Sequence, residues 1–474
     1  MVLLVYRIIA DVPVIIMGDT GCGKTALITV LNQIIHNGGN TLYLDKMKMM
    51  GPDGKLNKNK YNIDDEKNKT IPSLIIINIH PGITDKILCD YMEKVNKIAE
   101  KDNKEIWLFF DEMNTCLSLS LLTEIFINRT YNEKPLCKNI RIIGACNPYR
   151  RRKGNKEKCG LSLSNDNEEE LVYLVQPLPQ SLLYYVFSFG SIDSEDEKKY
   201  IHSIIQKSFT KEENTLHNIT RDAISACHIY LREKFDASVV SLREIARFSK
   251  CIEFFNNYFD IKNKFENKNR KIKLENNKKN NKLRSIICSI YLCYYIRLTS
   301  QDLRSQFEQK LRPILLKLIN NDENFKEEDG GFIKAIKNNK DLTNEIIKNG
   351  EKIEQFGDFI KIEQDYLIEQ IDLDKGIGKN SLLKENVFLL FVSVITNIPL
   401  IIIGKPGTGK SLSAQLICKS MRGKYSKKNT FFHEFKKINQ IYFQGSESTQ
   451  PEDVQRLFRK GENKLENYKK KKNR

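Results

Sequence analysis

The sequence predicts an α/β fold: a parallel sheet with its helices, then a run of helices, then the start of a second α/β unit. Two observations indicate this class. Short apolar runs rich in β-branched residues alternate with helical patterns over about the first 190 residues, which is typical of strands buried on both faces of a parallel sheet. A glycine-rich loop of one spacing also follows an apolar run twice, once near each end of the chain.

Five segments of the first unit have the nearly continuous apolar character of buried strands. They are residues 12–17, 74–79, 106–110, 140–145 and 171–175. Two polar stretches, residues 46–70 and 150–170, lie between them, and we expect both to be surface insertions. Residues 1–190 are therefore predicted to form a large α/β subdomain.

The middle of the chain has a helical pattern. Residues 194–257 contain no strand-like run, and apolar positions at 219–235 and 239–255 have helical spacing, which predicts a helical lid subdomain over residues 191–260. The Lys/Asn-rich stretch 256–284 is interpreted as an exposed linker. Helical spacing returns at 285–349, so residues 261–370 are predicted to hold a linker and a helical segment. The expected core stripe of that segment is Cys288, Leu292, Tyr295 and Ile296.

The α/β pattern then restarts, with an expected helix at 381–396 and an expected strand at 399–403 directly before the second glycine loop. We interpret residues 371–474 as the start of a second unit. No apolar strand ending in acidic residues follows before residue 474, so we expect this unit to be truncated and the chain to be a piece of a longer protein.

Composition narrows the class of protein. The 474 residues suffice for two or three domains, and no apolar run reaches the ~18–20 residues of a membrane span. Arg7 and Asp11 interrupt the apolar N-terminal run, so it is not read as a signal peptide, and we expect a cytoplasmic location. The net charge of +17 comes largely from Lys mixed with Asn, which favours solvated loops over a nucleic-acid surface. The 11 cysteines form no C-x-x-C pair, so neither disulfides nor zinc are predicted.

The first glycine loop matches the phosphate-binding pattern G-x-x-x-x-G-K-[ST]. Its residues are Gly18, Asp19, Thr20, Gly21, Cys22, Gly23, Lys24 and Thr25. Glycines let backbone N–H groups wrap around phosphate oxygens, and the expected following helix adds its positive dipole end. Lys24 is expected to neutralise the β- and γ-phosphates of ATP, and Thr25 to bind Mg²⁺. Cys22 is interpreted as a small filler residue and not as a nucleophile.

Two further strand ends carry polar residues that suit triphosphate hydrolysis. Asp111 and Glu112 follow the apolar run 106–110, where Asp111 would hold Mg²⁺ and Glu112 would act as general base. Asn147 ends the next expected strand and fits the AAA+ sensor that positions the attacking water. Arg243, with Arg247 as second choice, resembles the second sensor of AAA+ lids, although a solvent-facing arginine on an amphipathic helix would look the same.

The second glycine loop matches the same pattern in full. Its residues are Gly404, Lys405, Pro406, Gly407, Thr408, Gly409, Lys410 and Ser411. We expect nucleotide contacts here, with Ser411 as the Mg²⁺ ligand. No hydrolytic carboxylate is expected in this unit.

The sequences of these motifs resemble those of the mysterin family of giant RING-finger E3 ubiquitin ligases with a dynein-like AAA+ core. The segments that carry the resemblance include PVIIMGDTGCGKT at 13–25, LFFDEMNT at 108–115, GACNPYRR at 144–151 and VQPLPQSLL at 175–183. Residues 383–388, 398–409 and 443–452 resemble the family's next AAA+ unit. The one departure is Thr408-Gly409, where the family often has two serines.

The resemblance implies an intramolecular AAA+ ring, with neighbouring modules of a longer chain and ubiquitin-pathway proteins as partners and lipid-droplet association as an additional location. It also implies that an arginine finger for the Lys24 site comes from the second unit, whereas Arg129, Arg150 or Arg151 would serve a preceding module. Because no RING-like Cys/His ladder occurs here, ligase activity is not expected of this segment by itself.

Three alternatives stay open at this point. The chain could be a nucleotide-gated AAA+ scaffold with little or no hydrolysis. It could belong to another dynein-related machine of the midasin kind, without ligase activity. The nucleotide could also be GTP in place of ATP, because the residues of a phosphate-binding loop contact phosphates and not the base.

Overall fold

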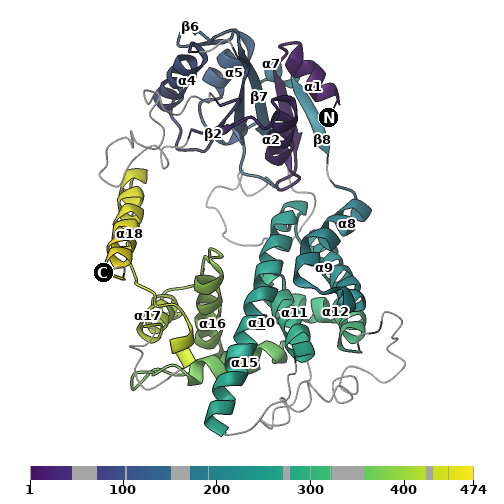
Figure 1. The fold of residues 1–474 in the computed structure, drawn as a ribbon, viewed down its shortest axis with the longest axis vertical. Helices are drawn as coiled ribbons and strands as arrows, with labels where there is room; N and C mark the ends of the chain where they lie inside the picture. The colour runs from purple at the N-terminus through teal and green to yellow at the C-terminus, as the bar shows by residue number, and fades with distance from the viewer. Residues whose placement is uncertain are drawn as a thin grey trace. The chain divides into compact units, whose positions relative to one another are not determined.

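A computed structural model of the chain describes residues 2–44, 72–101, 104–150, 171–190, 192–270, 278–298, 300–320, 322, 357–422, 431–446 and 448–472. The described residues divide into two compact units (Figure 1). The first holds residues up to 190 together with 441–472, and the second holds 192–440. The expected insertion 46–70 lies outside the described residues, and so does 150–170 apart from Arg150. Residues 323–356 of the expected linker and helical segment also lie outside them.

The first unit is built on a six-stranded parallel sheet with the strand order β2-β3-β4-β7-β1-β8. The strands are β1 (Val14–Gly18), β2 (Thr41–Tyr43), β3 (Leu74–Asn78), β4 (Ile106–Asp111), β7 (Ile140–Cys146) and β8 (Val186–Gly190). Runs such as Ile75-Ile76-Ile77 are fully buried because both faces of a parallel sheet are covered. The predicted α/β class is therefore confirmed.

Helices cover the two faces of this sheet. Helices α1 (Val2–Ile9) and α2 (Lys24–Ile35) pack with Trp107 and Phe109 in one apolar core. Helices α4 (Asp85–Ala99) and α5 (Leu119–Ile127) pack with Leu108 and Phe110 in the core on the other face. Successive residues of β4 thus point to opposite faces, as the two-residue period of a strand requires.

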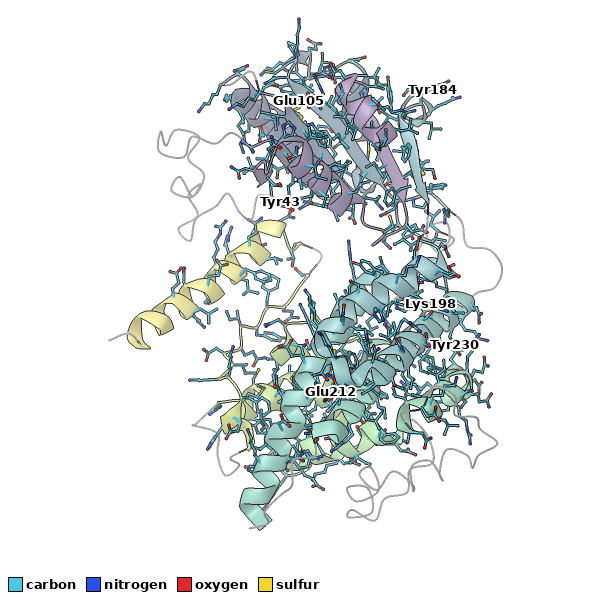
Figure 2. All side chains as sticks on the ribbon, turned by 45° about the vertical axis from the view of Figure 1, so that its right-hand side comes forward. Tyr43, Glu105, Tyr184, Lys198, Glu212 and Tyr230 are labelled. Carbon is cyan, nitrogen blue, oxygen red and sulfur yellow. The ribbon has the colours of Figure 1, made fainter. Side chains whose placement is uncertain are left out.

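Smaller elements complete the first unit: the turn η1 (Met113–Thr115), the β5–β6 hairpin (Thr130–Tyr131 and Lys134–Pro135), α7 (Gln180–Leu183) and α18 (Pro451–Lys472). Among the side chains in Figure 2, Tyr184 follows α7 and is 79% exposed at the edge of this unit.

Four of the five predicted strands are confirmed as β1, β3, β4 and β7, with ends shifted by one or two residues. The fifth prediction, residues 171–175, is wrong: this segment forms bends, and Leu174 is 60% exposed. The strand beside β1 is instead β8, which together with the three-residue β2 was missed. A short apolar run does not distinguish a strand from an apolar coil that packs on a loop.

The second unit is helical, as predicted for its N-terminal part. Its helices are α8 (Ser194–Ile205), α9 (Asn214–Lys234), α10 (Leu242–Arg270), α11 (Lys278–Cys293), α12 (Gln301–Asn320), α15 (Asp358–Glu369), α16 (Ser381–Thr396) and α17 (Lys410–Ser420). The 3₁₀ turns are η2 (Gln206–Ser208), η3 (Lys211–Glu213), η4 (Ala237–Val239), η5 (Tyr295–Arg297) and η8 (Phe431–Glu434). One apolar core runs through this unit and includes the predicted stripe, with Cys288 and Tyr295 buried and Leu292 and Ile296 packed against it.

The predicted linker at 256–284 is wrong over its described residues. Helix α10 continues to Arg270 and α11 already begins at Lys278. Tyr258 and Phe259 are buried, and even Lys262 is only 7% exposed. The Lys/Asn composition indicated solvation, but the apolar spacing within it supplies a core face, and Lys262 is paired inside that core.

Helix α16 matches its predicted range because polar residues define both ends. The Asn380 side chain accepts a hydrogen bond from Leu383 N at 2.8 Å and caps the helix. Asn397 ends it in the left-handed conformation, with φ 53°. The predicted strand at 399–403 is wrong: these residues are not in a sheet, and Ile401 is 82% exposed. A strand needs neighbours for its N–H and C=O groups, and no described strand pairs with this segment.

Candidate nucleotide-binding site

The polar residues predicted from the first unit meet at one edge of the sheet. Strands β4, β7 and β1 are neighbours and parallel, so their carboxyl ends lie side by side. Gly18 ends β1, Asp111 ends β4, and Asn147 directly follows β7. Ligands of open parallel α/β sheets bind at this edge.

The backbone of the first glycine loop has the conformation that a phosphate cradle needs. Gly21 and Gly23 have φ of 76° and 96°, a region that side chains with a Cβ rarely adopt. A Cβ on Gly18 would lie 3.0 Å from Cys22 Sγ and 3.2 Å from Phe189 Cβ. Helix α2 begins at Lys24, so its free N–H groups and positive dipole end point toward the loop.

Lys24 crosses back over this loop and is only 7% exposed. Its Nζ donates to the carbonyl oxygens of Gly18 at 2.6 Å and Asp19 at 3.0 Å, and to Asn147 Oδ1 at 3.0 Å. The ammonium is thus held in the mouth of the loop by oxygen acceptors. Phosphate oxygens are stronger acceptors of the same kind, so the position suits a bound triphosphate.

Thr25 and Asp111 form the second contact of the site. Thr25 Oγ1 donates to Asp111 Oδ2 at 2.6 Å, which joins the start of α2 to the end of β4. A hydroxyl and a carboxylate at adjoining positions are the protein ligands that Mg²⁺ has in phosphate-binding loops. The residues present therefore fit a magnesium ion beside the loop.

The backbone turns sharply at Glu112, directly after β4, where φ is 56° and ψ is 37°. Its carbonyl accepts hydrogen bonds from Thr115 N at 3.0 Å and Thr115 Oγ1 at 2.9 Å. A left-handed backbone at a non-glycine residue costs about 1–2 kcal/mol. Within the described residues the Glu112 carboxylate has no hydrogen-bond partner, which leaves it available to a water molecule.

Asn114 is a site residue that the sequence analysis missed. Its Nδ2 donates to the Asn147 carbonyl at 2.8 Å, and its Oδ1 accepts from Asn147 N at 3.2 Å. Its own carbonyl accepts from Gln176 N at 2.8 Å. Asn114 is 1% exposed and braces the segment that carries Asn147. No local pattern marks it, because all its partners are distant in sequence.

Asp19 also has partners that were not predicted. Its Oδ1 accepts from Tyr173 Oη at 3.3 Å and from Arg150 Nη1 at 3.4 Å. Burial, together with the nearby Asp19 charge, raises the pKa of Tyr173, so its hydroxyl stays protonated and remains a donor. The segment wrongly predicted as a strand therefore lies against the glycine loop.

The cysteines of the site are poor nucleophiles. Burial raises the pKa of Cys22, and it raises the pKa of Cys146 to about 12 despite the nearby charge of Lys24. Both side chains therefore remain protonated thiols at neutral pH. This agrees with the interpretation of Cys22 as a filler residue.

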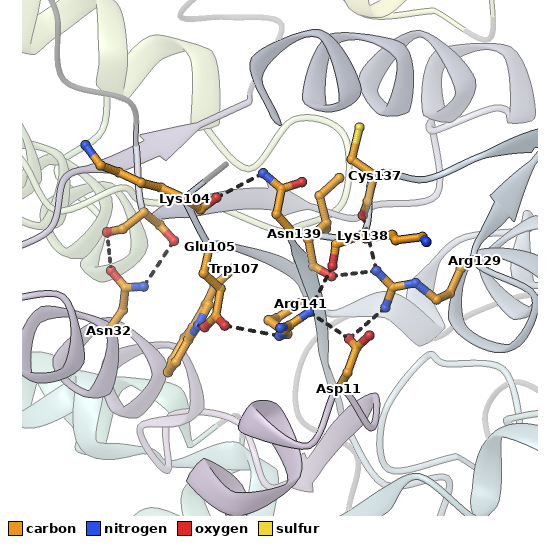
Figure 3. Close-up of polar contacts among 12 residues, drawn as sticks. Asp11, Asn32, Lys104, Glu105, Trp107, Arg129, Cys137, Lys138, Asn139 and Arg141 are labelled. Atoms are coloured by element: carbon orange, nitrogen blue, oxygen red, sulfur yellow. Dashed lines mark hydrogen bonds and ion pairs between the residues drawn. The ribbon is translucent and has the colours of Figure 1, made fainter. Parts of the chain in front are cut away.

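The arginines proposed as fingers for another module have partners within the first unit. Arg129 donates to Asp11 at 2.8 Å and to the Ile140 carbonyl at 2.8 Å, at the amino edge of the sheet and not at its carboxyl edge (Figure 3). Arg141 shares Asp11 and also contacts Glu105 at 3.2 Å. Arg150 contacts Asp19, and Arg151 lies outside the described residues.

Arg243 belongs to the second unit, where it is exposed near the start of α10 and its N–H donates to Ser241 Oγ at 3.3 Å. Arg247 pairs with the buried Glu244 at 2.9 Å. The assignment of Arg243 as a second sensor stays a prediction.

The second glycine loop repeats the backbone of the first. Gly407 and Gly409 have φ of 80° and 77°, and α17 begins at Lys410. Lys410 Nζ donates to the carbonyl oxygens of Gly404 and Lys405, as Lys24 does to Gly18 and Asp19. Ser411 differs from Thr25: it is exposed, and within the described part of the chain it has no carboxylate partner.

The sheet, the lysine-bearing glycine loop and the polar carboxyl edge define an AAA-type α/β domain. Residues 55–150 match the family model of one RNF213 AAA domain, and residues 376–474 match that of another. Both family models, and the relatives that follow, are of the RNF213, or mysterin, family, so this is the family that the chain is similar to.

Three relatives align with 96% of this chain. They are E3 ubiquitin-protein ligase rnf213-beta of Danio rerio (27% identical) and the E3 ubiquitin-protein ligases RNF213 of Homo sapiens (28%) and Mus musculus (25%). The chain spans about 8% of the length of each. None of the described helices combines the length and apolar character that a membrane span requires.

Proposed function

We propose that this chain binds ATP and Mg²⁺ at its first glycine loop and hydrolyses the ATP as one AAA+ module of a longer E3 ubiquitin-protein ligase. The observation that carries the proposal is the network at the carboxyl edge of the sheet. Lys24 bridges the loop to Asn147, and Thr25 is hydrogen bonded to Asp111. The first loop precedes both matched ranges, so this proposal depends on geometry and motif.

Each residue has one task in the proposed reaction. Backbone N–H groups of the loop and the Lys24 ammonium would hold the phosphates, and Thr25 and Asp111 would hold Mg²⁺. The ion supplies neutralisation of phosphate charge when it is bound. Glu112 would accept the proton of the attacking water, and Asn147, braced by Asn114, would orient that water.

The second loop is proposed as a nucleotide-binding site with Lys410 and Ser411 as its phosphate and Mg²⁺ contacts. An arginine finger from a neighbouring module would complete the first site, so the chain by itself should bind ATP better than it turns ATP over. We propose that Arg243 contributes from the lid. Ligase chemistry and ubiquitin-pathway partners are assigned to the longer protein, because the relatives are E3 ubiquitin-protein ligases. A cytoplasmic location and lipid-droplet association are proposed by resemblance.

Equilibrium binding of Mg·ATP to the whole chain tests the proposed site. Lys24→Ala should weaken binding at the first loop at least ~10-fold, because a charge-assisted contact to phosphate is lost. Lys97→Ala, an exposed lysine on α4, is the matched control and should leave binding unchanged. Competition by GTP tests which base the site prefers. If GTP competes as well as ATP does, the choice of ATP is contradicted. Binding that Lys24→Ala and Lys410→Ala together leave intact would contradict both sites.

A further inference from the structure

We propose that Arg150 senses the terminal phosphate of the nucleotide bound in its own module, with the Asp19 carboxylate as the competing partner of its guanidinium. This inference deepens the proposed function and rests on it. It assigns Arg150 to the site in the same unit, and not to a neighbouring module as the resemblance to AAA+ rings implied.

The contact between Arg150 and Asp19 is weak and exchangeable. The guanidinium Nη1 lies 3.4 Å from Asp19 Oδ1, at the long end of hydrogen-bond geometry. The Arg150 side chain is 57% exposed, whereas that of Asp19 is 18% exposed. A half-exposed arginine in such a contact gains little from it, so a stronger anion can take its place.

The base of the Arg150 side chain is nevertheless fixed beside the site. Its carbonyl accepts a hydrogen bond from Val172 N at 2.9 Å. Asn147, three residues earlier in the chain, contacts Lys24 Nζ at 3.0 Å. The backbone position of Arg150 is thus set by the segment that also holds the sensor asparagine, while its long side chain can reorient.

The guanidinium contacts the loop at Asp19, a residue that Lys24 also contacts. Asp19 is the second residue of the loop, and its carbonyl accepts from Lys24 Nζ, the group proposed to contact the β- and γ-phosphates. Arg150 and Lys24 therefore converge on the same residue from its side chain and its backbone. A γ-phosphate carries more negative charge than the Asp19 carboxylate and accepts two parallel hydrogen bonds from a guanidinium.

Asp19 competes with a bound nucleotide for the Arg150 guanidinium. A carboxylate in an anion-binding loop opposes phosphate binding unless a cation offsets it. Tyr173 Oη donates to the same Oδ1 at 3.3 Å, so the carboxylate keeps one partner when Arg150 moves away. Exchange of Arg150 from Asp19 to phosphate is then favoured by a triphosphate and not by a diphosphate.

The test is the ratio of the dissociation constants for Mg·ADP and Mg·ATP, measured on the whole chain and on single variants. Arg150→Gln should raise the Kd for ATP about 10-fold and the Kd for ADP less than about 2-fold, because only the outer phosphate contact is lost. Asp19→Asn should keep or increase the preference for ATP. Arg141→Gln removes the same charge at the opposite sheet edge and should leave the ratio unchanged.

Two results would overturn the inference while leaving the proposed function standing. One is ATP binding with a Kd ratio that Arg150→Gln does not change. The other is an increase in the Kd for ATP with Asp19→Asn equal to that with Arg150→Gln, because Arg150 would then act only by fixing the conformation of Asp19. Failure of the unmodified chain to bind ATP at all would instead overturn the proposed function, and the inference with it.

Discussion

Asn147 is held from two sides: its side chain accepts from Lys24, and its backbone is paired with the Asn114 amide. At the scale of single residues, the site therefore depends on Asn114, which is buried and contacts no proposed ligand. Its contribution is to fix where the Asn147 amide lies relative to the glycine loop.

Asn114→Ala should slow ATP turnover about 10-fold while changing the Kd for ATP less than about 3-fold, because it displaces the group that orients water and not those that hold phosphate. Steady-state turnover and equilibrium binding check this. Asn139→Ala is the control: the Asn139 amide braces the opposite sheet edge through the Ala99 and Lys104 carbonyls, so its loss should reduce stability without changing turnover. An equal effect of both variants on turnover would contradict the positioning role.

Residues with a local signature could be predicted from the sequence. Lys24 and Thr25 belong to a fixed spacing, and Asp111 follows an apolar strand. Asn114, Tyr173 and the pairing of Arg150 could not be predicted, because each contact joins segments far apart in the chain.

At the scale of helices, a buried charge cluster joins α10, α11 and α15. Glu363 accepts from Lys262 at 2.9 Å and from Arg284, and it is 1% exposed. Lys262 lies over the Tyr366 ring at 4.2 Å, and Arg284 over the Phe259 ring at 4.1 Å. Burial by itself would raise the pKa of Glu363, but the two cations outweigh it and lower that pKa. The cluster explains why a lysine-rich segment forms core helices.

Glu363→Ala should destabilise the helical unit by about 3–5 kcal/mol, because it leaves two buried cations without their carboxylate. The free energy of unfolding from denaturant titration measures this. Lys361→Ala breaks an exposed pair with Asp358 on the same helix and should cost less than about 0.5 kcal/mol. A loss below about 1 kcal/mol for Glu363→Ala would show that the cluster does not hold the helices together.

Helices α8 and α9 are joined by a second buried carboxylate. Glu197 accepts from His228 at 2.8 Å and from Arg232 at 2.7 Å. Burial opposes its charged form, but these hydrogen bonds prevail and lower the pKa of Glu197 from 4.5 to about 2. A carboxylate with a lowered folded-state pKa stabilises the fold above its unfolded pKa and loses that contribution as pH falls through the folded pKa.

The stability of the helical unit should therefore fall between about pH 4.5 and about pH 2, with roughly 3 kcal/mol of that fall attributable to Glu197. Glu197→Gln should remove that share of the pH dependence and lower stability at neutral pH. Glu195→Gln, an exposed position on the same helix, should change neither. Identical pH profiles for the unmodified chain and Glu197→Gln would contradict the role of this pair.

The helices and strands differ in how well a local sequence pattern predicts them. Helix α16 was predicted in full because its apolar stripe is bounded by Asn380 and Asn397. The predicted strand at 399–403 was wrong, because a parallel strand is defined by neighbours that a local pattern does not contain. The prediction of an exposed linker was wrong at 256–270, because composition does not distinguish the buried Lys262 from a solvated lysine.

At the scale of the whole molecule, the chain carries two glycine loops with nearly the same backbone and different surroundings. The loop of Lys24 lies at a sheet edge with Asp111 and Glu112, whereas the described surroundings of Ser411 contain no such carboxylate. We therefore assign the proposed hydrolysis to the first loop.

The most direct test is ATP turnover by the longer protein, which supplies the neighbouring modules, with and without Glu112→Gln. The account predicts that Glu112→Gln lowers turnover about 100-fold or more, since a general base contributes that much, while ATP binding changes less than about 3-fold. If the unmodified protein and Glu112→Gln bind ATP and turn it over equally slowly, the enzyme assignment is contradicted, and the chain is a nucleotide-gated scaffold.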